Sequence, residues 1–180
     1  MEYKVTNADV IQEGVWDEKS CVRRQGGYDI DKSNLPADLK YLPKGATLAY
    51  NAENGKVIVV KTAKVSEKAT SGTSLKIGKA NIVAVGDVLN GLTVSAIDRS
   101  NASYDVLTVS TISETLNVGD VIADENAAKS IGLNYATVNI DSNPTCTPTV
   151  QAYEIEEGSL PYPVNAAIKD ALTVRHAFKL

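Results

Sequence analysis

The stretch Val85-Gly86-Asp87-Val88-Leu89 returns further along the chain as Val118-Gly119-Asp120-Val121-Ile122. Glycine adopts the positive φ that tight turns require, aspartate accepts hydrogen bonds from nearby backbone amides, and the flanking valines favour a pleated strand. The two stretches therefore predict two strand–turn–strand corners between about residues 80 and 125. Two copies are fewer than the about three repeats that a solenoid needs, so we expect one β-meander with two similar corners.

Length and composition set the scale of the fold. The 180 residues suffice for one ordinary domain or for two small lobes. The hydrophobic share of 43% is close to that of globular proteins, which excludes wholesale disorder. The apolar residues include many valines but only one Trp, one Phe and one Met, so each buried side chain removes little area from water. Such a core favours thin sheets and burial shared between subunits.

We expect a mainly β fold: a small β-barrel or sandwich-like module inserted on a hairpin/strand base, with an extended N-terminal arm and one short C-terminal helix. The arm comprises residues 1–35, the base residues 36–65 and 129–180, and the module residues 66–128. Within the base, Asn54-Gly55 is a strong hairpin dipeptide and predicts a β-hairpin.

The C-terminal segment predicts a helix and then a strand. Asn165 is a suitable N-cap for a short helix that continues to Leu172. Apolar and polar residues alternate from Thr173 to Leu180, which predicts a half-buried strand. The chain's single histidine, His176, falls on the apolar face of this strand together with Val174. We therefore interpret it as a structural, hydrogen-bonded histidine rather than a catalytic or zinc-binding one.

The N-terminal 35 residues show little hydrophobic periodicity, which is typical of an extended arm that docks on a neighbouring chain. Val15 and Trp16 form a small apolar patch in this arm, and tryptophan is enriched among interface hot spots. Equally, Trp16 could fill the core of its own domain. Both alternatives stay open at this point.

Two further segments are candidate contacts. Val57-Ile58-Val59-Val60 is apolar on both faces, so it is buried on both sides, by its own lobe or by a partner subunit. Arg23-Arg24 is the chain's one pair of adjacent arginines, and such a pair usually lies in a solvated loop. The candidate capsid or subunit contacts are therefore Val15, Trp16, Arg23, Arg24, Val57 and Val59.

The residues that carry chemistry in enzymes are scattered along this chain. Its glycines form no phosphate-binding pattern, and its turn carboxylates lack the spacing of a calcium-binding loop. Cys21 and Cys146 have no Cys-x-x-Cys spacing, so we expect two free thiols in a protein made in a reducing cytosol. We expect no enzymatic activity, no metal and no cofactor. The turn carboxylates in question are Asp87, Asp98, Asp105 and Asp120.

Charge and hydropathy exclude two classes of partner. The net charge is −4 and acidic and basic residues are interspersed, whereas nucleic-acid binding needs a basic stripe. No apolar run approaches the roughly 18–20 residues of a membrane span, and residues 1–9 contain no apolar signal region. We expect a soluble protein synthesised in the host cytoplasm, with no nucleic acid and no membrane as partner.

Several phrases together resemble the head-fibre and auxiliary (decoration) capsid proteins of tailed bacteriophages, in particular those of crAss-like gut phages. They occur in order from about residue 29 to the C-terminus. The phrases are Leu42-Pro43-Lys44-Gly45, Leu48-Ala49, Gly55-Lys56, Val60-Lys61-Thr62-Ala63-Lys64-Val65, Val85-Gly86-Asp87-Val88, Ser103-Tyr104-Asp105-Val106-Leu107-Thr108-Val109 and Lys169-Asp170-Ala171-Leu172-Thr173-Val174-Arg175.

The resemblance implies a virion structural protein on the outer surface of the capsid. Its partners would be the major capsid protein and further copies of itself, with a trimer favoured over a dimer. The family has no catalytic signature to transfer. The alternative is an adhesive β-domain whose loops 98–103 and 142–149 bind a host-surface glycan. A hydrolase that uses scattered carboxylates ranks third.

Overall fold

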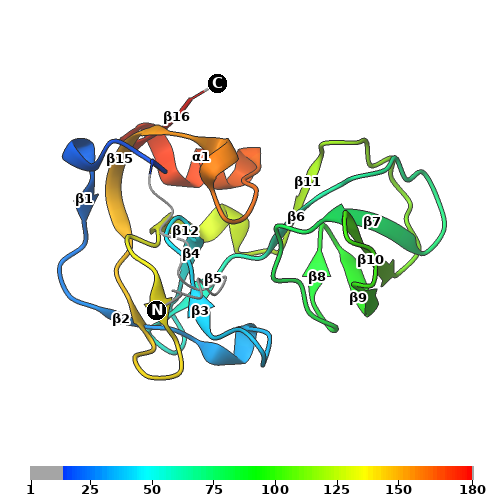
Figure 1. Ribbon diagram of the computed structural model, residues 1–180, viewed down its shortest axis with the longest axis horizontal. Coiled ribbons are helices and arrows are strands. Elements are labelled where there is room, and N and C mark those ends of the chain that lie inside the picture. The colour runs from blue at the N-terminus through cyan, green and yellow to red at the C-terminus, as the bar shows by residue number, and fades with distance from the viewer. Residues whose placement is uncertain (1–13, 180) are drawn as a thin grey trace, which may run out of the picture.

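In the computed structural model, which describes residues 14–179, the chain forms two lobes joined by two chain crossings (Figure 1). Strands occupy 39% of the protein and helical turns 13%, which confirms the predicted mainly β fold. The one α-helix of the described residues is short and lies near the C-terminus, as predicted. The larger lobe is the base and the smaller one is the module.

The base is built from short strands in four small sheets. Their orders are β12-β4-β5, β1-β15-β16, β13-β3 and β14-β2. The base comprises η2 (Glu18–Ser20), β1 (Val22–Arg23), β2 (Tyr28–Asp29), η3 (Lys32–Asn34), β3 (Tyr41–Leu42), β4 (Thr47–Asn51), β5 (Lys56–Val59), η4 (Ala127–Lys129), β12 (Ser130–Leu133), β13 (Val138–Asn139), β14 (Thr145–Cys146), β15 (Thr149–Ile155), η5 (Glu157–Ser159), α1 (Ala166–Leu172), η6 (Thr173–Arg175) and β16 (His176–Phe178).

The predicted hairpin of the base is confirmed. Strands β4 and β5 pair antiparallel with Leu48 opposite Val59. Gly55 closes the turn between them with a φ of 69°, a backbone conformation that favours glycine.

The N-terminal segment from residue 14 belongs to the base rather than to a separate arm, which corrects the predicted boundary at residue 35. Strand β1 pairs with β15, and β2 pairs with β14. Ile30 forms a bridge with Val57 of β5. A segment without hydrophobic periodicity can still supply short strands, because β1 and β2 are only two residues long and such strands need no repeating apolar pattern. Residues 1–13 of the predicted arm lie outside the described residues.

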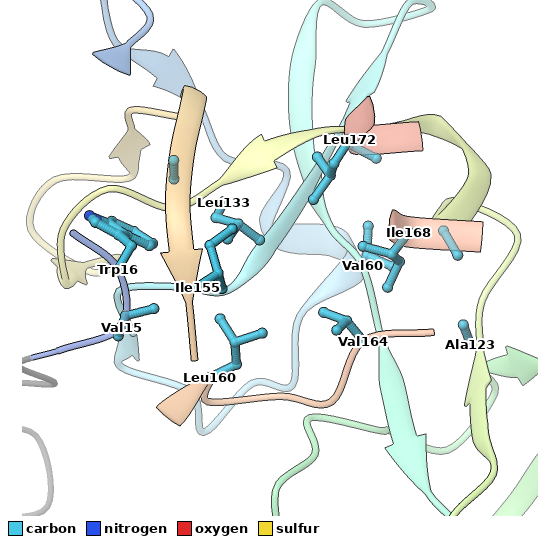
Figure 2. Close-up of a cluster of buried hydrophobic side chains, with 13 residues drawn as sticks. Val15, Trp16, Val60, Ala123, Leu133, Ile155, Leu160, Val164, Ile168 and Leu172 are labelled. Carbon is cyan, nitrogen blue, oxygen red and sulfur yellow. The ribbon is translucent and has the colours of Figure 1, made fainter. Parts of the chain in front are cut away.

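The base core packs around α1 and β15. Figure 2 shows Trp16, Leu133, Ile155 and Leu172 pointing toward a common interior, although they come from four separate segments. A second apolar cluster lies on the other side of β4 and β5. Both clusters are built from segments far apart in the sequence, so neither half of the base can complete its core alone.

The module is a small barrel-like ring of strands around one apolar cluster, in line with the predicted barrel or sandwich. Its sheets run β7-β10-β9-β8 and β11-β6. A bridge between Val65 and Ile77 links the two sheets on one side, and the Asn90 N–H donates to the Ala123 carbonyl (2.8 Å) on the other. The module comprises β6 (Thr62–Lys64), β7 (Ser74–Gly78), β8 (Val88–Leu89), β9 (Leu92–Asp98), β10 (Tyr104–Val109) and β11 (Val121–Ala123).

The two Val-Gly-Asp-Val corners are equivalent turns, as the sequence indicates. Gly86 and Gly119 have φ angles of 96° and 94°. The carboxylate of Asp87 accepts a hydrogen bond from the Ala84 N–H (2.7 Å). The carboxylate of Asp120 accepts the matching bond from the Asn117 N–H, also at 2.7 Å. Each aspartate therefore closes its own turn.

The corners do not belong to one meander, which corrects that prediction. The first corner makes two hydrogen bonds with Val94. The Gly86 N–H donates to the Val94 carbonyl (2.8 Å), and the Val94 N–H donates to the Asp87 carbonyl (2.8 Å). The second corner makes the same pair of bonds to Val65, which lies in the first half of the module. The first corner is therefore bonded by β9, which follows it closely in the chain, whereas the second corner is bonded by Val65, which lies far back in the chain at the end of β6. The repeated Val-Gly-Asp-Val sequence identifies both turns, but the contact of the second turn with Val65 is a matter of tertiary pairing.

The module boundaries shift by a few residues from the predicted 66–128. Ala63 and Val65 are already buried in the module cluster, and Ile122 is its last member. The chain therefore enters the module at Lys61-Thr62 and leaves it at Ala123-Asp124. These two crossings pair with each other, since the Asp124 N–H donates to the Lys61 carbonyl (3.0 Å).

The C-terminal segment confirms the helix and shortens the strand. Asn165 caps α1, and its side-chain oxygen accepts a hydrogen bond from the Ile168 N–H (3.0 Å). Strand β16 spans only His176–Phe178, because the 3-10 turn η6 intervenes after α1. Val174 was predicted on the buried face but is 90% exposed, since that turn breaks the two-residue alternation before the strand begins.

Candidate functional site

Four of the six predicted contact residues lie in the core of the base. Val15, Val57 and Val59 are fully buried, and Trp16 is 4% exposed. Their side chains are therefore covered by the chain itself, which corrects their assignment as capsid or subunit contacts. Two alternatives were open for Trp16 and for the valines of β5: burial in their own lobe or contact with a partner. The structure shows that they are buried in their own lobe.

The other two predicted contacts, Arg23 and Arg24, are exposed at the edge strand β1 and diverge from each other. The guanidinium of Arg23 lies over the ring of Tyr135, 5.0 Å from its centroid. Tyr135 in turn stacks on Trp16, with 6.4 Å between ring centroids. Lys44 lies over the same indole (4.6 Å). The buried tryptophan thus supports a surface on which two cations are held by aromatic rings.

Arg24 lines a different feature, a cleft of about 260 Å³ in the base. The cleft lies where β1 ends and β15 begins, because the Arg24 N–H donates to the Pro148 carbonyl (2.9 Å). Arg175 of η6 lines the same cleft. The structure therefore brings together one predicted arginine and one that the sequence did not single out.

A larger cleft of about 740 Å³ lies at the junction of the lobes. Lys61 at its floor is 4% exposed, and its ammonium group contacts both oxygens of Asp87 (2.6 and 2.8 Å). Burial raises the pKa of Asp124, whose carboxylate accepts hydrogen bonds from the backbone N–H groups of Lys61 and Asn126. These contacts tie the crossings to the first corner of the module, so we assign the cleft a structural role.

Asp105 is fully buried and forms an ionic network inside the module. Its carboxylate contacts Lys79 (2.5 Å), Arg99 (2.8 Å) and the amide of Asn81 (3.0 Å). Burial opposes its charge, but the hydrogen bonds from Lys79 and Asn81 and the charge of Arg99 hold the pKa of Asp105 below its ordinary value. This network anchors the 98–103 turn. Among residues 14–179, no group of three or more His, Cys, Asp or Glu side chains is placed to share a metal ion.

The two loops considered for glycan binding belong to different lobes (Figure 1). The 98–103 turn joins β9 to β10 in the module, whereas 142–149 surrounds β14 in the base. The two loops therefore do not form one continuous tip.

His176 is buried and hydrogen-bonded at both ring nitrogens, as the sequence predicted. Nδ1 faces the Leu172 carbonyl (3.1 Å), so it carries the proton in this arrangement. Nε2 then accepts from the hydroxyl of Thr149 (2.9 Å), and that hydroxyl oxygen accepts from the Leu133 N–H (2.9 Å). The neutral ring thereby links α1, β15 and β12.

This histidine gives the fold a pH dependence. Burial lowers the pKa of His176 in the folded protein below its ordinary value of 6.5. The stability that the neutral ring supplies is complete above pH 6.5 and is lost as the pH falls toward the folded-state pKa, because unfolding then takes up a proton. We expect the free energy of unfolding, measured by urea denaturation, to fall between pH 7.5 and 5.5. The variant His176→Gln should show a smaller fall, and an equal fall would contradict this assignment.

The two cysteines are free, as predicted. Burial raises the pKa of Cys21 to about 11 and that of Cys146 to about 12. Both groups are therefore thiols rather than thiolates at neutral pH, and a thiol is a poor nucleophile.

Comparisons with known proteins do not place this chain in a family: no family model, no curated protein and no solved structure matches it. Within the described part of the chain, no helix is long and apolar enough to cross a membrane.

Sequence reasoning missed Arg175 and the ion pair of Lys61 with Asp87. The ion pair had a signal, because Lys61 directly follows the apolar run Val57–Val60 and precedes a strand, and a buried lysine needs a counter-charge. Arg175 had none, since its position in the cleft depends on η6 turning the chain between α1 and β16.

Proposed function

We propose that this protein is a virion structural protein, an auxiliary capsid or head-fibre subunit of a tailed bacteriophage. It would be made in the host cytoplasm, assemble as a homo-oligomer with a trimer favoured over a dimer, and bind the outer face of the major capsid protein lattice. The resemblance in sequence supports this proposal, since its phrases run through both lobes. The proposal includes no catalytic step and no cofactor.

The observation that carries the proposal is the exposed edge of the base at β1. The edge of a sheet presents unpaired backbone groups to a partner. Here the edge also presents Arg23 and Arg24, and the neighbouring side chains of Val22 and Tyr153 are 50% and 39% exposed. Arginine and tyrosine are enriched at protein interfaces. The base would therefore contact the shell, and the module would be held away from it.

Purified virions whose genome encodes this chain test the proposal. We expect mass spectrometry to find the protein at a fixed ratio to the major capsid protein, and cryo-electron microscopy to place the base against the shell. Static light scattering of the purified protein should give an oligomer at micromolar concentration. Absence from virions would reject the proposal, and a monomer would reject its oligomeric part. The adhesive alternative would gain support from binding on a glycan array.

A further inference from the structure

Two arginines from distant parts of the chain converge on one cleft of the base. Arg24 follows β1 and Arg175 ends η6, and both line the cleft of about 260 Å³. The backbone bond to Pro148 holds Arg24 beside the start of β15. The parallel pairing of β16 with β15 begins at His176 and holds Arg175 at the same end. The fold therefore fixes the backbone of both residues.

Neither guanidinium is neutralised. Within residues 14–179, Arg24 and Arg175 form no ion pair and no side-chain hydrogen bond, and no Asp or Glu lines the cleft. Arg23, by contrast, is held against Tyr135. Acids outnumber bases in this chain, whose net charge is −4. Two unpaired arginines in one concavity therefore make a positive site on an acidic protein.

The rest of the cleft contains three polar side chains, those of Ser130, Thr173 and His176, beside four apolar ones. Thr173 lines the cleft and is exposed to solvent. Thr173 has a φ of 60°, which is unfavourable for a β-branched residue, and such positions cluster at binding sites. Both nitrogens of His176 are already engaged within the fold. The apolar walls come from Ile131, Val150, Ala171 and Leu172.

We propose that the Arg24–Arg175 cleft binds a carboxylate side chain presented by an acidic segment of a partner protein. Guanidinium groups match carboxylates with paired, charge-assisted hydrogen bonds. The volume of about 260 Å³ is below the roughly 300–1,000 Å³ of small-molecule sites, which favours one side chain over a whole ligand. This inference rests on the proposed function and specifies the chemistry by which a shell protein is recognised.

Two arginines on an acidic chain do not make the extended basic surface that nucleic acids require. The same argument disfavours an anionic membrane, which attracts clusters of about 4–8 basic residues. A protein segment needs only one or two charged contacts within a larger interface. The charge pattern therefore favours a protein partner.

Titration calorimetry of the purified protein at low ionic strength tests this inference, with a capped hexaglutamate peptide as the probe. We expect binding to the native protein and a loss of about tenfold or more in affinity for Arg24→Gln and for Arg175→Gln. Lys68→Gln is the matched control, because it removes an exposed positive charge of the module that lies outside the cleft. Its affinity should stay within about twofold of the native value. Circular dichroism verifies that each variant is folded.

Four results would overturn the inference: no binding of hexaglutamate, an equal loss in Lys68→Gln, tighter binding of inorganic phosphate at the same cleft, or self-association that depends on Arg24 and Arg175. The titration needs no virion, so it is independent of the test of the proposed function. Undiminished shell binding by the Arg24→Gln/Arg175→Gln double variant would reject the cleft and leave the proposed function intact.

Discussion

Replacement of Asp87 with asparagine is expected to lower the free energy of unfolding by about 3–5 kcal/mol. Both oxygens of Asp87 contact the ammonium group of Lys61, which is 4% exposed. Without the carboxylate charge, a buried cation loses its counter-charge, and that loss costs far more than a surface ion pair. For a protein of this size, we expect the melting temperature to fall by roughly 6–20 °C.

The second corner supplies a matched control. Asp120 occupies the equivalent position and accepts the equivalent turn bond, but it is exposed and forms no ion pair within the described residues. An asparagine oxygen can still accept the turn bond at either position. We therefore expect Asp120→Asn to change stability by no more than about 0.5 kcal/mol, as exposed substitutions usually do. Equal effects of the two variants in urea denaturation would contradict a specific role for the ion pair.

A double variant tests the same point from the other side. In Lys61→Met/Asp87→Asn the buried cation is gone, and a buried ion pair can often be replaced by apolar groups at little cost. We expect this double variant to recover most of the stability that Asp87→Asn loses. If it does not, the loss arises from the turn and not from the uncompensated charge.

Truncation of Trp16 to alanine is expected to cost about 3–5 kcal/mol of unfolding free energy. The indole is 4% exposed and packs in the cluster that includes Leu133 and Ile155 (Figure 2). It also stacks on Tyr135. Its removal leaves a cavity and also removes the ring that supports Lys44. Thermal unfolding followed by circular dichroism measures the effect.

Val174→Ala is the control for this truncation, because Val174 is 90% exposed and contributes little to the core. It should melt within about 2 °C of the native protein. The two alternatives for Trp16 give opposite results. A docking residue could be truncated with no change in melting temperature, whereas a core residue could not. An unchanged melting temperature for Trp16→Ala would therefore contradict the core position of Trp16 and support a docking role.

Local signals in the sequence predicted the local structure well. The Asn54-Gly55 hairpin, the helix capped by Asn165 and the two glycine-aspartate corners all occur where they were predicted. Each depends on a backbone conformation or a capping bond within a few residues, so nearby residue types suffice to specify it. Prediction weakened where the determinant was distant. The expected strand from residue 173 failed at Val174, because the helix end imposed a turn.

The candidate sites were harder to predict, because burial is a property of the whole fold. The apolar residues at positions 15, 16, 57 and 59 indicate only that their side chains are buried away from water in the folded protein. Whether their own lobe or a partner covers them depends on segments far away in the sequence, such as β15 and α1 for Val15 and Trp16. For the same reason the sequence drew attention to Arg24 but not to Arg175.

The sequence by itself determined the β-rich class, the place of the turns and the existence of two equivalent corners. These follow from short-range backbone preferences, which do not change with the rest of the chain. Only the tertiary structure decided that the second corner of the module bonds Val65, that Trp16 is part of the base core, and that two unpaired arginines share one cleft. The physical reason is that strand pairing, burial and charge pairing arise between segments that only the folded chain brings together.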